Sequence, residues 1–218
     1  FTFSLADRTA DCYARDVAFF DGCASFDVMI HGQLYAHVDL HIPGKHNILN
    51  SMACAAVCLY LGMNPEEMAE HIDKFPGAGR RFEILGEVNG VTIADDYAHH
   101  PTEIAATLKA AKEMDFHEVW AVFQPFTYSR TALLMDDFVT ALSVADHVVM
   151  SEIMGSREKN TYNIYTKDLA EKIPGSVWFN TFKEMADYTM SHAKPGDLVI
   201  TLGCGDVYKC AYIMAGID

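Results

Sequence analysis

Four side chains that can exchange protons or bind ions lie within one short stretch of the sequence: Asp95, Asp96, His99 and His100. An apolar run that predicts a strand precedes them, and Pro101 opens a helical pattern after them. Ligands of open α/β sheets bind outside the carboxyl ends of strands. Asp and His are seldom buried unless they are paired or bind something. We therefore expect a ligand site here, the alternative being a polar turn that only starts a helix.

Adjacent His99 and His100 also raise the question of a metal site completed by a carboxylate. On an extended segment, neighbouring side chains point to opposite faces and cannot share one ion. We therefore assign no metal ligands within this chain.

A second candidate lies where Gly44-Lys45 precedes a predicted helix. A phosphate-binding loop would need a serine or threonine after the lysine, but this chain has His46. Asn47 and Asn50 lie three residues apart on one face of the helix. Their amides offer a donor and an acceptor, which suits an adenine edge. The alternative is that one asparagine only caps the helix and that the other is a polar side chain with hydrogen bonds inside the protein.

Arginines provide two further candidates. Arg80 and Arg81 follow the segment 75–79, whose Pro and Gly residues make it the best linker candidate. On a strand, two adjacent arginines alternate, so one could face a cleft and bind a phosphate or a ribose; otherwise they form a solvated basic pair. Arg130 follows the predicted strand 118–123, and its planar fork suits a substrate carboxylate.

The elements that must position these side chains can be predicted from hydrophobic periodicity. Residues 1 to about 42 predict short strands with turns at Asp21-Gly22 and His31-Gly32, and helices follow over about 47–61 and 64–72. After the linker, strands and helices alternate, which predicts an α/β fold with a mostly parallel, Rossmann-like sheet covered by helices on both faces. The predicted strands are about 82–88, 91–95, 118–123, 147–152, 176–179 and 197–202, and the predicted helices about 101–114, 130–143, 166–172, 181–192 and 206–215.

Composition narrows the class of protein. Half of the 218 residues are hydrophobic, which provides for a sizeable core. The formal net charge of −14 argues against nucleic acid or an anionic membrane as partner. No apolar run is long enough to span a membrane. The six cysteines form no Cys-x-x-Cys pair, which is typical of reduced thiols in the cytoplasm. The sequence starts without a methionine or a signal peptide, so we expect it to begin inside a longer protein.

Six ordered motifs, running from about residue 30 to the end, together resemble the Mur ligases of bacterial peptidoglycan synthesis. They are Gly44-Lys45-His46-Asn47 with Asn50, Arg80-Arg81-Phe82-Glu83, Asp95 to Ile104, Gln124-Pro125 with Tyr128-Ser129-Arg130-Thr131, Arg157-Glu158-Lys159, and Thr201-Leu202-Gly203 with Gly205-Asp206. His99-His100-Pro101 followed by Gln124-Pro125 favours the alanine-adding branch. Phe126 and Thr127 depart from it, because some members carry His and Arg there.

The resemblance implies that residues 1–78 are the last part of a central ATP-binding domain and that 79–218 are a C-terminal, dinucleotide-type domain that binds the amino acid. It implies an ATP-dependent amide ligase that joins L-alanine to the carboxylate of UDP-N-acetylmuramate through an acyl phosphate. The alternatives are another Mur-type ligase, such as the murein-peptide recycling ligase, or a non-catalytic nucleotide-binding module of the same fold.

The resemblance also implies roles for individual residues. His46, Asn47 and Asn50 would approach the adenine of ATP. Arg81 with Asp95 or Asp96 would hold ribose and phosphates, and His99 or His100 with Arg130 would position L-alanine. The phosphate loop and the Mg²⁺ ligands are expected outside this sequence, so we expect no activity from it alone. Residues 1–43 would expose an incomplete sheet, which predicts pairing with another copy or poor local order.

Overall fold

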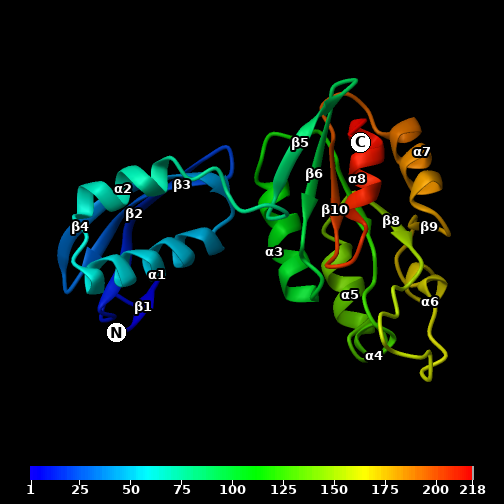
Figure 1. The fold of residues 1–218 in the computed structure, drawn as a ribbon, viewed down its shortest axis with the longest axis horizontal. Coiled ribbons are helices and arrows are strands. Elements are labelled where there is room, and N and C mark those ends of the chain that lie inside the picture. Colours follow the sequence, from blue (N-terminus) through cyan, green and yellow to red (C-terminus); the bar gives the residue numbers. More distant parts are fainter. Residues whose placement is uncertain (218) are drawn as a thin grey trace. The chain divides into compact units, whose positions relative to one another are not determined.

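The computed structural model describes residues 1–217 and divides into two units (Figure 1). Unit 1 is Phe1–Gly77, and unit 2 begins at Ala78. The boundary falls within the Pro- and Gly-containing segment 75–79, between the last helix of unit 1 and the first strand of unit 2. Each unit has its own buried apolar core.

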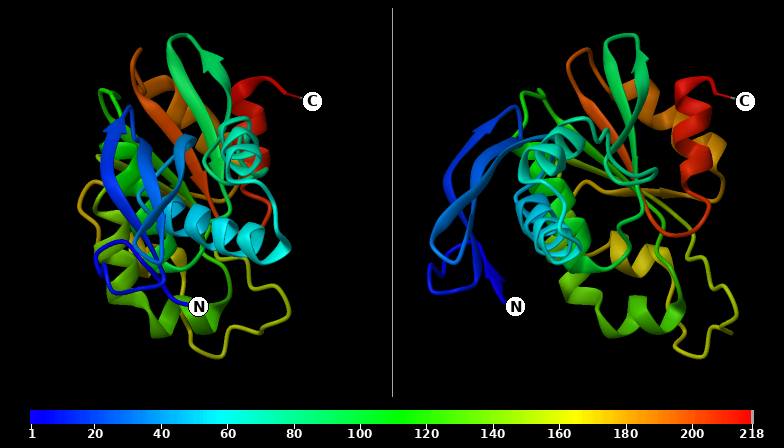
Figure 2. Two further views of the ribbon diagram at one scale, coloured as in Figure 1. Left: turned by 90° about the vertical axis from the view of Figure 1, so that its left-hand side faces the viewer. Right: turned by 60° about the vertical axis from the view of Figure 1, so that its left-hand side comes forward.

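Unit 1 is a four-stranded sheet with two helices on one face, which Figure 2 shows as cyan helices beside the blue strands. The strands in sheet order are β1 (Phe3–Ser4), β2 (Cys12–Phe20), β3 (Cys23–Ile30) and β4 (Gln33–Pro43). β1 is parallel to β2, and the other pairs are antiparallel. Both predicted turns are confirmed: Asp21-Gly22 and His31-Gly32 have positive φ at both positions, as tight hairpins require.

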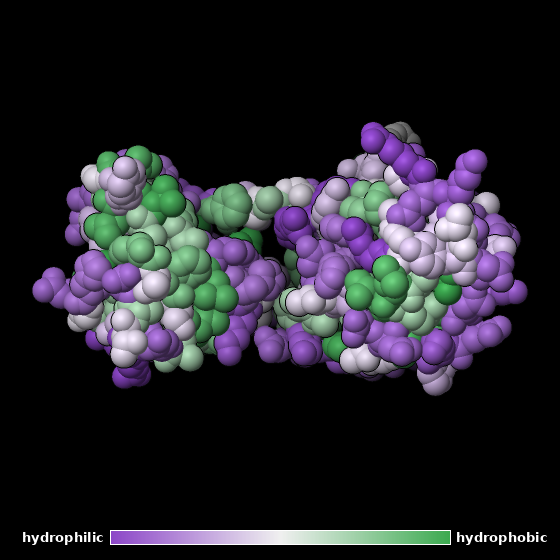
Figure 3. Space-filling view, turned by 90° about the horizontal axis from the view of Figure 1, so that it is seen from below, coloured by the Kyte–Doolittle hydropathy of each residue, from purple (hydrophilic) through white to green (hydrophobic). Residues whose placement is uncertain are grey.

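The helices of unit 1 are α1 (His46–Leu61) and α2 (Pro65–Asp73). α1 ends at Gly62, whose φ of 72° is left-handed, and Asn64 caps α2 by accepting hydrogen bonds from two backbone N–H groups. α1 buries one apolar face in the core, but its outward face is also apolar and includes exposed Val57 and Leu61. Figure 3 shows this largely apolar surface on the underside of unit 1.

Unit 2 contains a six-stranded sheet in the order β5-β6-β10-β7-β8-β9. Its strands are β5 (Glu83–Val88), β6 (Val91–Asp96), β7 (Val119–Phe123), β8 (His147–Ser151), β9 (Val177–Phe179) and β10 (Leu198–Leu202). All neighbours are parallel except β5, which pairs antiparallel with β6 at the edge. The predicted mostly parallel α/β sheet is therefore confirmed.

Helices cover both faces of this sheet. The described helices of unit 2 are α3 (Pro101–Lys112), α4 (Tyr128–Leu133), α5 (Met135–Leu142), α6 (Thr166–Ala170), α7 (Phe182–His192) and α8 (Tyr208–Ala215). Side chains of α3, α5 and α6 share one core, and those of α7 and α8 share the core on the opposite face. None of the described helices combines the length and apolarity needed to cross a membrane.

The prediction of one helix over 130–143 is wrong, because the chain breaks at Leu134, where φ is −112° and ψ is 24°. The break redirects α5 so that Phe138 is fully buried, with its ring centre 5.5 Å from that of Phe123. Burial of an aromatic ring against the sheet outweighs the continuous helical pattern.

Candidate functional site

The strand order of unit 2 creates a topological switch point. β10 lies between β6 and β7, and it is followed by a helix on the opposite face from the helix that follows β6. Ligands of open α/β sheets bind at the carboxyl ends of strands at such a point. Asp95 and Asp96 end β6, Gln124 follows β7, and Gly203 follows β10, so the sequence motifs converge at this edge.

Arg80 joins two of these strand ends. Its Nε donates to Asp95 at 2.7 Å, its Nη2 to the carbonyl oxygen of Gly203 at 2.7 Å, and its Nη1 to that of Gly205 at 3.3 Å. Asp95 is almost fully buried and also accepts from the Thr201 hydroxyl at 2.6 Å. All three donor nitrogens of the guanidinium are therefore used to fix the edge, a role that the sequence did not reveal.

The expectation that the arginine pair alternates on a strand is wrong. Arg80 and Phe82 have φ of 58° and 48°, so the pair lies in a turn, and β5 starts only at Glu83. The Arg80 N–H donates to the Glu83 carboxylate at 2.7 Å, which holds that turn. Arg81 is exposed, with its guanidinium 5.5 Å from the ring centre of Tyr97. Arg81 is thus free to meet a ligand, whereas Arg80 is structural.

Asp96 is 5% exposed and accepts from the backbone N–H groups of Phe82 at 2.8 Å and Ala98 at 2.7 Å. Burial raises the pKa of this carboxyl above its ordinary value, although the two N–H groups and the charge of Arg81 oppose the shift. Of the three residues expected to bind ribose and phosphates, Asp95 and Asp96 are therefore buried and hydrogen-bonded, and Arg81 is accessible.

His99 and His100 lie at the start of α3. Nδ1 of His100 accepts from the N–H of Thr102, and the Glu103 carboxylate accepts from the N–H groups of both histidines at 3.1 and 3.2 Å. This reciprocal arrangement is a capping box. His100 thus fills the helix-starting role, which was the alternative interpretation of this segment. His99 is half-buried, and its Nδ1 lies 3.1 Å from the carbonyl oxygen of Tyr97.

Glu103 gives the site a measurable pH response. Partial burial raises the pKa of Glu103, but the N–H groups of His99 and His100 outweigh it and bring this pKa below its ordinary value. A carboxyl group whose pKa is lower in the folded state stabilises the fold at any pH above its unfolded-state pKa. This stabilisation is lost as the pH falls through the folded-state pKa. We expect Glu103→Ala to lower the free energy of unfolding by about 1 kcal/mol at neutral pH, and by less in acid. Urea unfolding across that range, with exposed Glu87→Ala as control, checks this; a loss independent of pH would contradict it.

Arg130 lies in the first turn of α4. This helix directly follows Thr127, whose φ of 69° is unusual for a β-branched residue. The Arg130 guanidinium lies 6.0 Å from the ring centre of Phe126 and interacts with the Cys204 thiol, while its Nη1 is buried without a hydrogen-bond partner among the described residues. The neighbouring Glu158 carboxylate is already engaged by the N–H and hydroxyl of Ser129 at 2.8 and 2.5 Å. A buried unsatisfied donor costs about 1–3 kcal/mol, and an arginine fork matches a carboxylate. One buried donor of Arg130 is therefore left unpaired by the described residues.

A cavity of about 450 Å³ opens beside this loop at the carboxyl ends of β7 and β8. Gln124 and Asp206 form one wall and exchange two hydrogen bonds of 3.1 Å. Glu152 contributes a carboxylate that has no hydrogen bond or ion pair within the described residues. A bridge between Phe126 and Met154 ties the Arg130 loop to the cavity wall. The sequence did not reveal Glu152, because the predicted strand 147–152 includes it as a single polar residue, whereas β8 ends at Ser151.

Comparison with known proteins decides the family. The family model described as "Mur ligase, glutamate ligase domain" matches residues 80–205. The chain belongs to the Mur ligase family. It is 41% identical over 213 residues to the UDP-N-acetylmuramate–L-alanine ligase of Caldanaerobacter subterraneus subsp. tengcongensis, covering 95% of this chain and 46% of that protein. For the ligase of the same name from Agathobacter rectalis, identity is 44% over 208 residues, with 93% and 45% covered.

Solved Mur ligase structures share the fold. The UDP-N-acetylmuramate–alanine ligase of Thermotoga maritima gives a TM-score of 0.83 at 24% identity, over 99% of this chain and 47% of that one. The murein peptide ligase of Psychrobacter arcticus gives 0.67 at 24% identity, over 98% and 45%. The chain thus spans about half the length of the curated relatives it matches.

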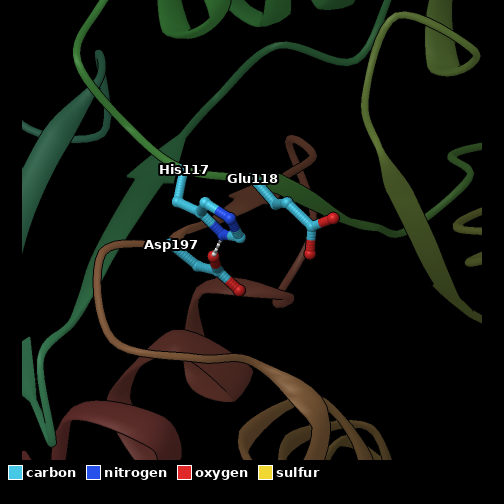
Figure 4. A group of neighbouring side chains, drawn as sticks. All are labelled: His117, Glu118 and Asp197. Carbon is cyan, nitrogen blue, oxygen red and sulfur yellow. Dashed lines mark hydrogen bonds and ion pairs between the residues drawn. The ribbon is translucent and has the colours of Figure 1, made fainter.

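Mur ligases are ATP-dependent, so we tested whether the described residues offer a Mg²⁺ site. The group among them that could hold a metal is His117, Glu118 and Asp197 (Figure 4), at the amino ends of β7 and β10 and thus at the opposite edge. Mg²⁺ prefers oxygen ligands in octahedral geometry. Asp197 is fully buried and already accepts from Trp120 Nε1 at 3.1 Å and from the N–H of Lys194 at 2.9 Å. This group does not fit Mg²⁺, and it braces the sheet instead.

The brace predicts a large stability effect. Burial raises the pKa of Asp197, but hydrogen bonds from Lys194, His117 and Trp120 outweigh it and leave the pKa below its ordinary value. Asp197→Ala would leave the buried Trp120 indole N–H and the part-buried Lys194 N–H without their acceptor, so we expect a loss of about 2–4 kcal/mol in the free energy of unfolding at neutral pH. The loss should shrink in acid as the wild-type carboxylate is protonated. Urea unfolding with exposed Asp115→Ala as control measures it, and two equally stable variants would contradict the brace.

Proposed function

We propose that this chain forms part of an ATP-dependent amide ligase that joins L-alanine to the carboxylate of UDP-N-acetylmuramate. Unit 1 would be the last part of the central ATP-binding domain, and unit 2 the C-terminal domain that binds the amino acid. The names of the relatives at 41–44% identity support the substrates. The observation that carries the proposal is the buried Nη1 of Arg130, which has no partner among residues 1–217.

The amino-acid subsite would combine Arg130 with the adjoining cavity. Arg130 would bind the α-carboxylate of L-alanine through its fork. Asp206 already pairs with Lys209 at 3.4 Å, but the cavity lining contains no basic residue and the Glu152 carboxylate has no partner within the described residues, which favours an ammonium group on that side. Opposite charges at the two ends of a zwitterion would then fix its orientation.

The proposed reaction has two steps. ATP phosphorylates the muramyl carboxylate, which releases ADP and leaves an acyl phosphate. The alanine amine, after losing a proton, attacks the acyl carbon and forms a tetrahedral intermediate that expels phosphate. His99, whose ring is half-buried at the carboxyl edge, would accept the ammonium proton, because a neutral imidazole nitrogen can act as a general base. His100 would support it by fixing the start of α3.

Each unit carries residues that we propose to contact ATP. In unit 1, Asn47 donates to the carbonyl oxygen of Pro43 at 2.8 Å and accepts from Asn50 at 2.9 Å, which leaves the Asn50 carbonyl oxygen for the adenine edge beside His46. In unit 2, Arg81 would meet the ribose or phosphates above Asp96. The sequence has no phosphate-binding lysine loop, and the metal-sized group found among residues 1–217 does not fit Mg²⁺, so we propose that the chain binds substrates without turnover.

Calorimetry tests the proposal. L-Alanine, glycine, L-glutamate and meso-diaminopimelate are each titrated into the chain, with and without ATP. Selective binding of L-alanine supports the proposed ligase, and a preference for another amino acid moves the assignment to a sister ligase. The cavity is roomier than a methyl side chain needs, which favours the murein-peptide recycling ligase as the second candidate. Titration of the free tripeptide L-alanyl-γ-D-glutamyl-meso-diaminopimelate distinguishes the two.

We also propose that unit 1 self-associates through residues 1–43. β4 is an edge strand of 11 residues, and an exposed edge offers unpaired backbone groups to another copy. We expect sedimentation velocity to show a fraction of dimer that increases with protein concentration. Leu34→Lys, which adds charge to the exposed start of β4, should lower this fraction. A monomer with fully exchange-protected amides in 1–43 would contradict it.

A further inference from the structure

Two thiols on α1 lie next to each other. Cys54 and Cys58 are one helical turn apart, and their Sγ atoms are separated by 4.0 Å. Cys54 is exposed on the outward face of the helix, and Cys58 is 9% exposed. Both cysteines are reduced. Solvent therefore reaches the pair from one side, while the apolar core of unit 1 closes the other.

A disulfide does not suit this geometry. Side chains four residues apart on a helix have Cβ atoms roughly 5–6 Å apart, whereas a disulfide needs roughly 3.5–4.5 Å. Oxidation would therefore distort α1. A metal ion has a longer reach, because each metal–thiolate bond is roughly 2.3 Å long. Two such bonds at an angle of about 120° span about 4.0 Å, which equals the observed Sγ–Sγ distance.

We propose that Cys54 and Cys58 form a dithiolate site for a soft monovalent cation of the Cu(I) class. Thiolates select soft ions, whereas Zn²⁺ usually needs four protein ligands. No third His, Cys, Asp or Glu of residues 1–217 joins this pair in a metal-sized group. The site is therefore suited to an ion that accepts two thiolates and leaves its remaining position to solvent or a small thiol.

Binding at this site involves no redox change. Each thiol releases its proton to solvent, and the two sulfur lone pairs form two bonds to the cation, so Cu(I) and two thiols give a dithiolate complex and two protons. Burial, together with the neighbouring Cys58 thiol, raises the pKa of Cys54, so affinity should increase with pH. The ion would lie one turn beyond Asn50, on the same face of the helix.

The test uses the 218-residue chain under nitrogen. Cu(I) is delivered as its acetonitrile complex in competition with a chromophoric Cu(I) chelator, and native mass spectrometry counts bound ions. We expect one tight equivalent, weakened at least tenfold in Cys54→Ser and in Cys58→Ser, and a shift of the Asn50 amide in the NMR spectrum. Cys23→Ser and Cys204→Ser are matched controls that should keep the tight equivalent.

Two results would overturn the site. One is a folded Cys54→Ser variant that retains the tight equivalent. The other is equal loss in Cys54→Ser and Cys204→Ser, which would mean that Cu(I) binds thiols without preference. Because Cys54 is exposed, its serine variant is expected to fold, and circular dichroism verifies this independently. None of these readouts depends on ligase activity.

Discussion

Arg130→Lys should weaken the binding of L-alanine by about 30- to 150-fold, which corresponds to about 2–3 kcal/mol, and Arg130→Ala should weaken it further. Lysine keeps the charge but loses the planar fork that pairs with both oxygens of a carboxylate. Calorimetry measures the dissociation constants, and exposed Lys109→Ala in the last turn of α3, outside the cavity lining, serves as the charge control. Equal affinity in wild type and Arg130→Ala would place the amino acid elsewhere.

Stability provides a second readout for Arg130. The buried Nη1 has no partner among the described residues, so the ligand-free fold bears the cost of an unsatisfied donor. We therefore expect Arg130→Met to leave the free energy of unfolding unchanged or to raise it by up to about 1 kcal/mol, while ligand binding is lost. A marked loss of stability would mean that Arg130 is a structural residue.

Arg80→Met should lower the free energy of unfolding by about 3–5 kcal/mol. The substitution leaves the Asp95 carboxylate buried without its cation and removes the hydrogen bonds to the carbonyl oxygens of Gly203 and Gly205. Urea unfolding measures the loss. Exposed Arg81→Met is the matched control and should change stability by less than about 0.5 kcal/mol.

A double variant separates the ion pair from the rest of the Arg80 contacts. If the uncompensated charge dominates, Arg80→Met with Asp95→Asn should be more stable than Arg80→Met alone, because the buried charge is removed together with its partner. Equal stability of the single and double variants would instead assign the loss to the carbonyl contacts and to the packing of the guanidinium near Tyr97 and Tyr208.

Periodicity in the sequence predicts the inner strands of unit 2, because β7 and β10 are short apolar runs that the sheet buries on both faces. It failed at Arg80 and Thr127, whose positive φ is stabilised by tertiary contacts that no local pattern contains. The convergence of Asp95 with Gly203 follows from strand order, which the alternation of elements does not specify. The unpartnered carboxylate of Glu152 can be recognised only from its three-dimensional surroundings.

The position of β10 also bears on how the protein is made. During translation the ribosome releases β6 and β7 long before β10, yet β10 pairs with both of them. Until Leu202 has emerged from the exit tunnel, β6 and β7 cannot pair with β10, and each keeps one unpaired edge. The sheet therefore closes late and through contacts distant in sequence, which slows folding and exposes the chain to aggregation. A stop codon before Leu198 would remove the strand on which the two halves of the sheet meet.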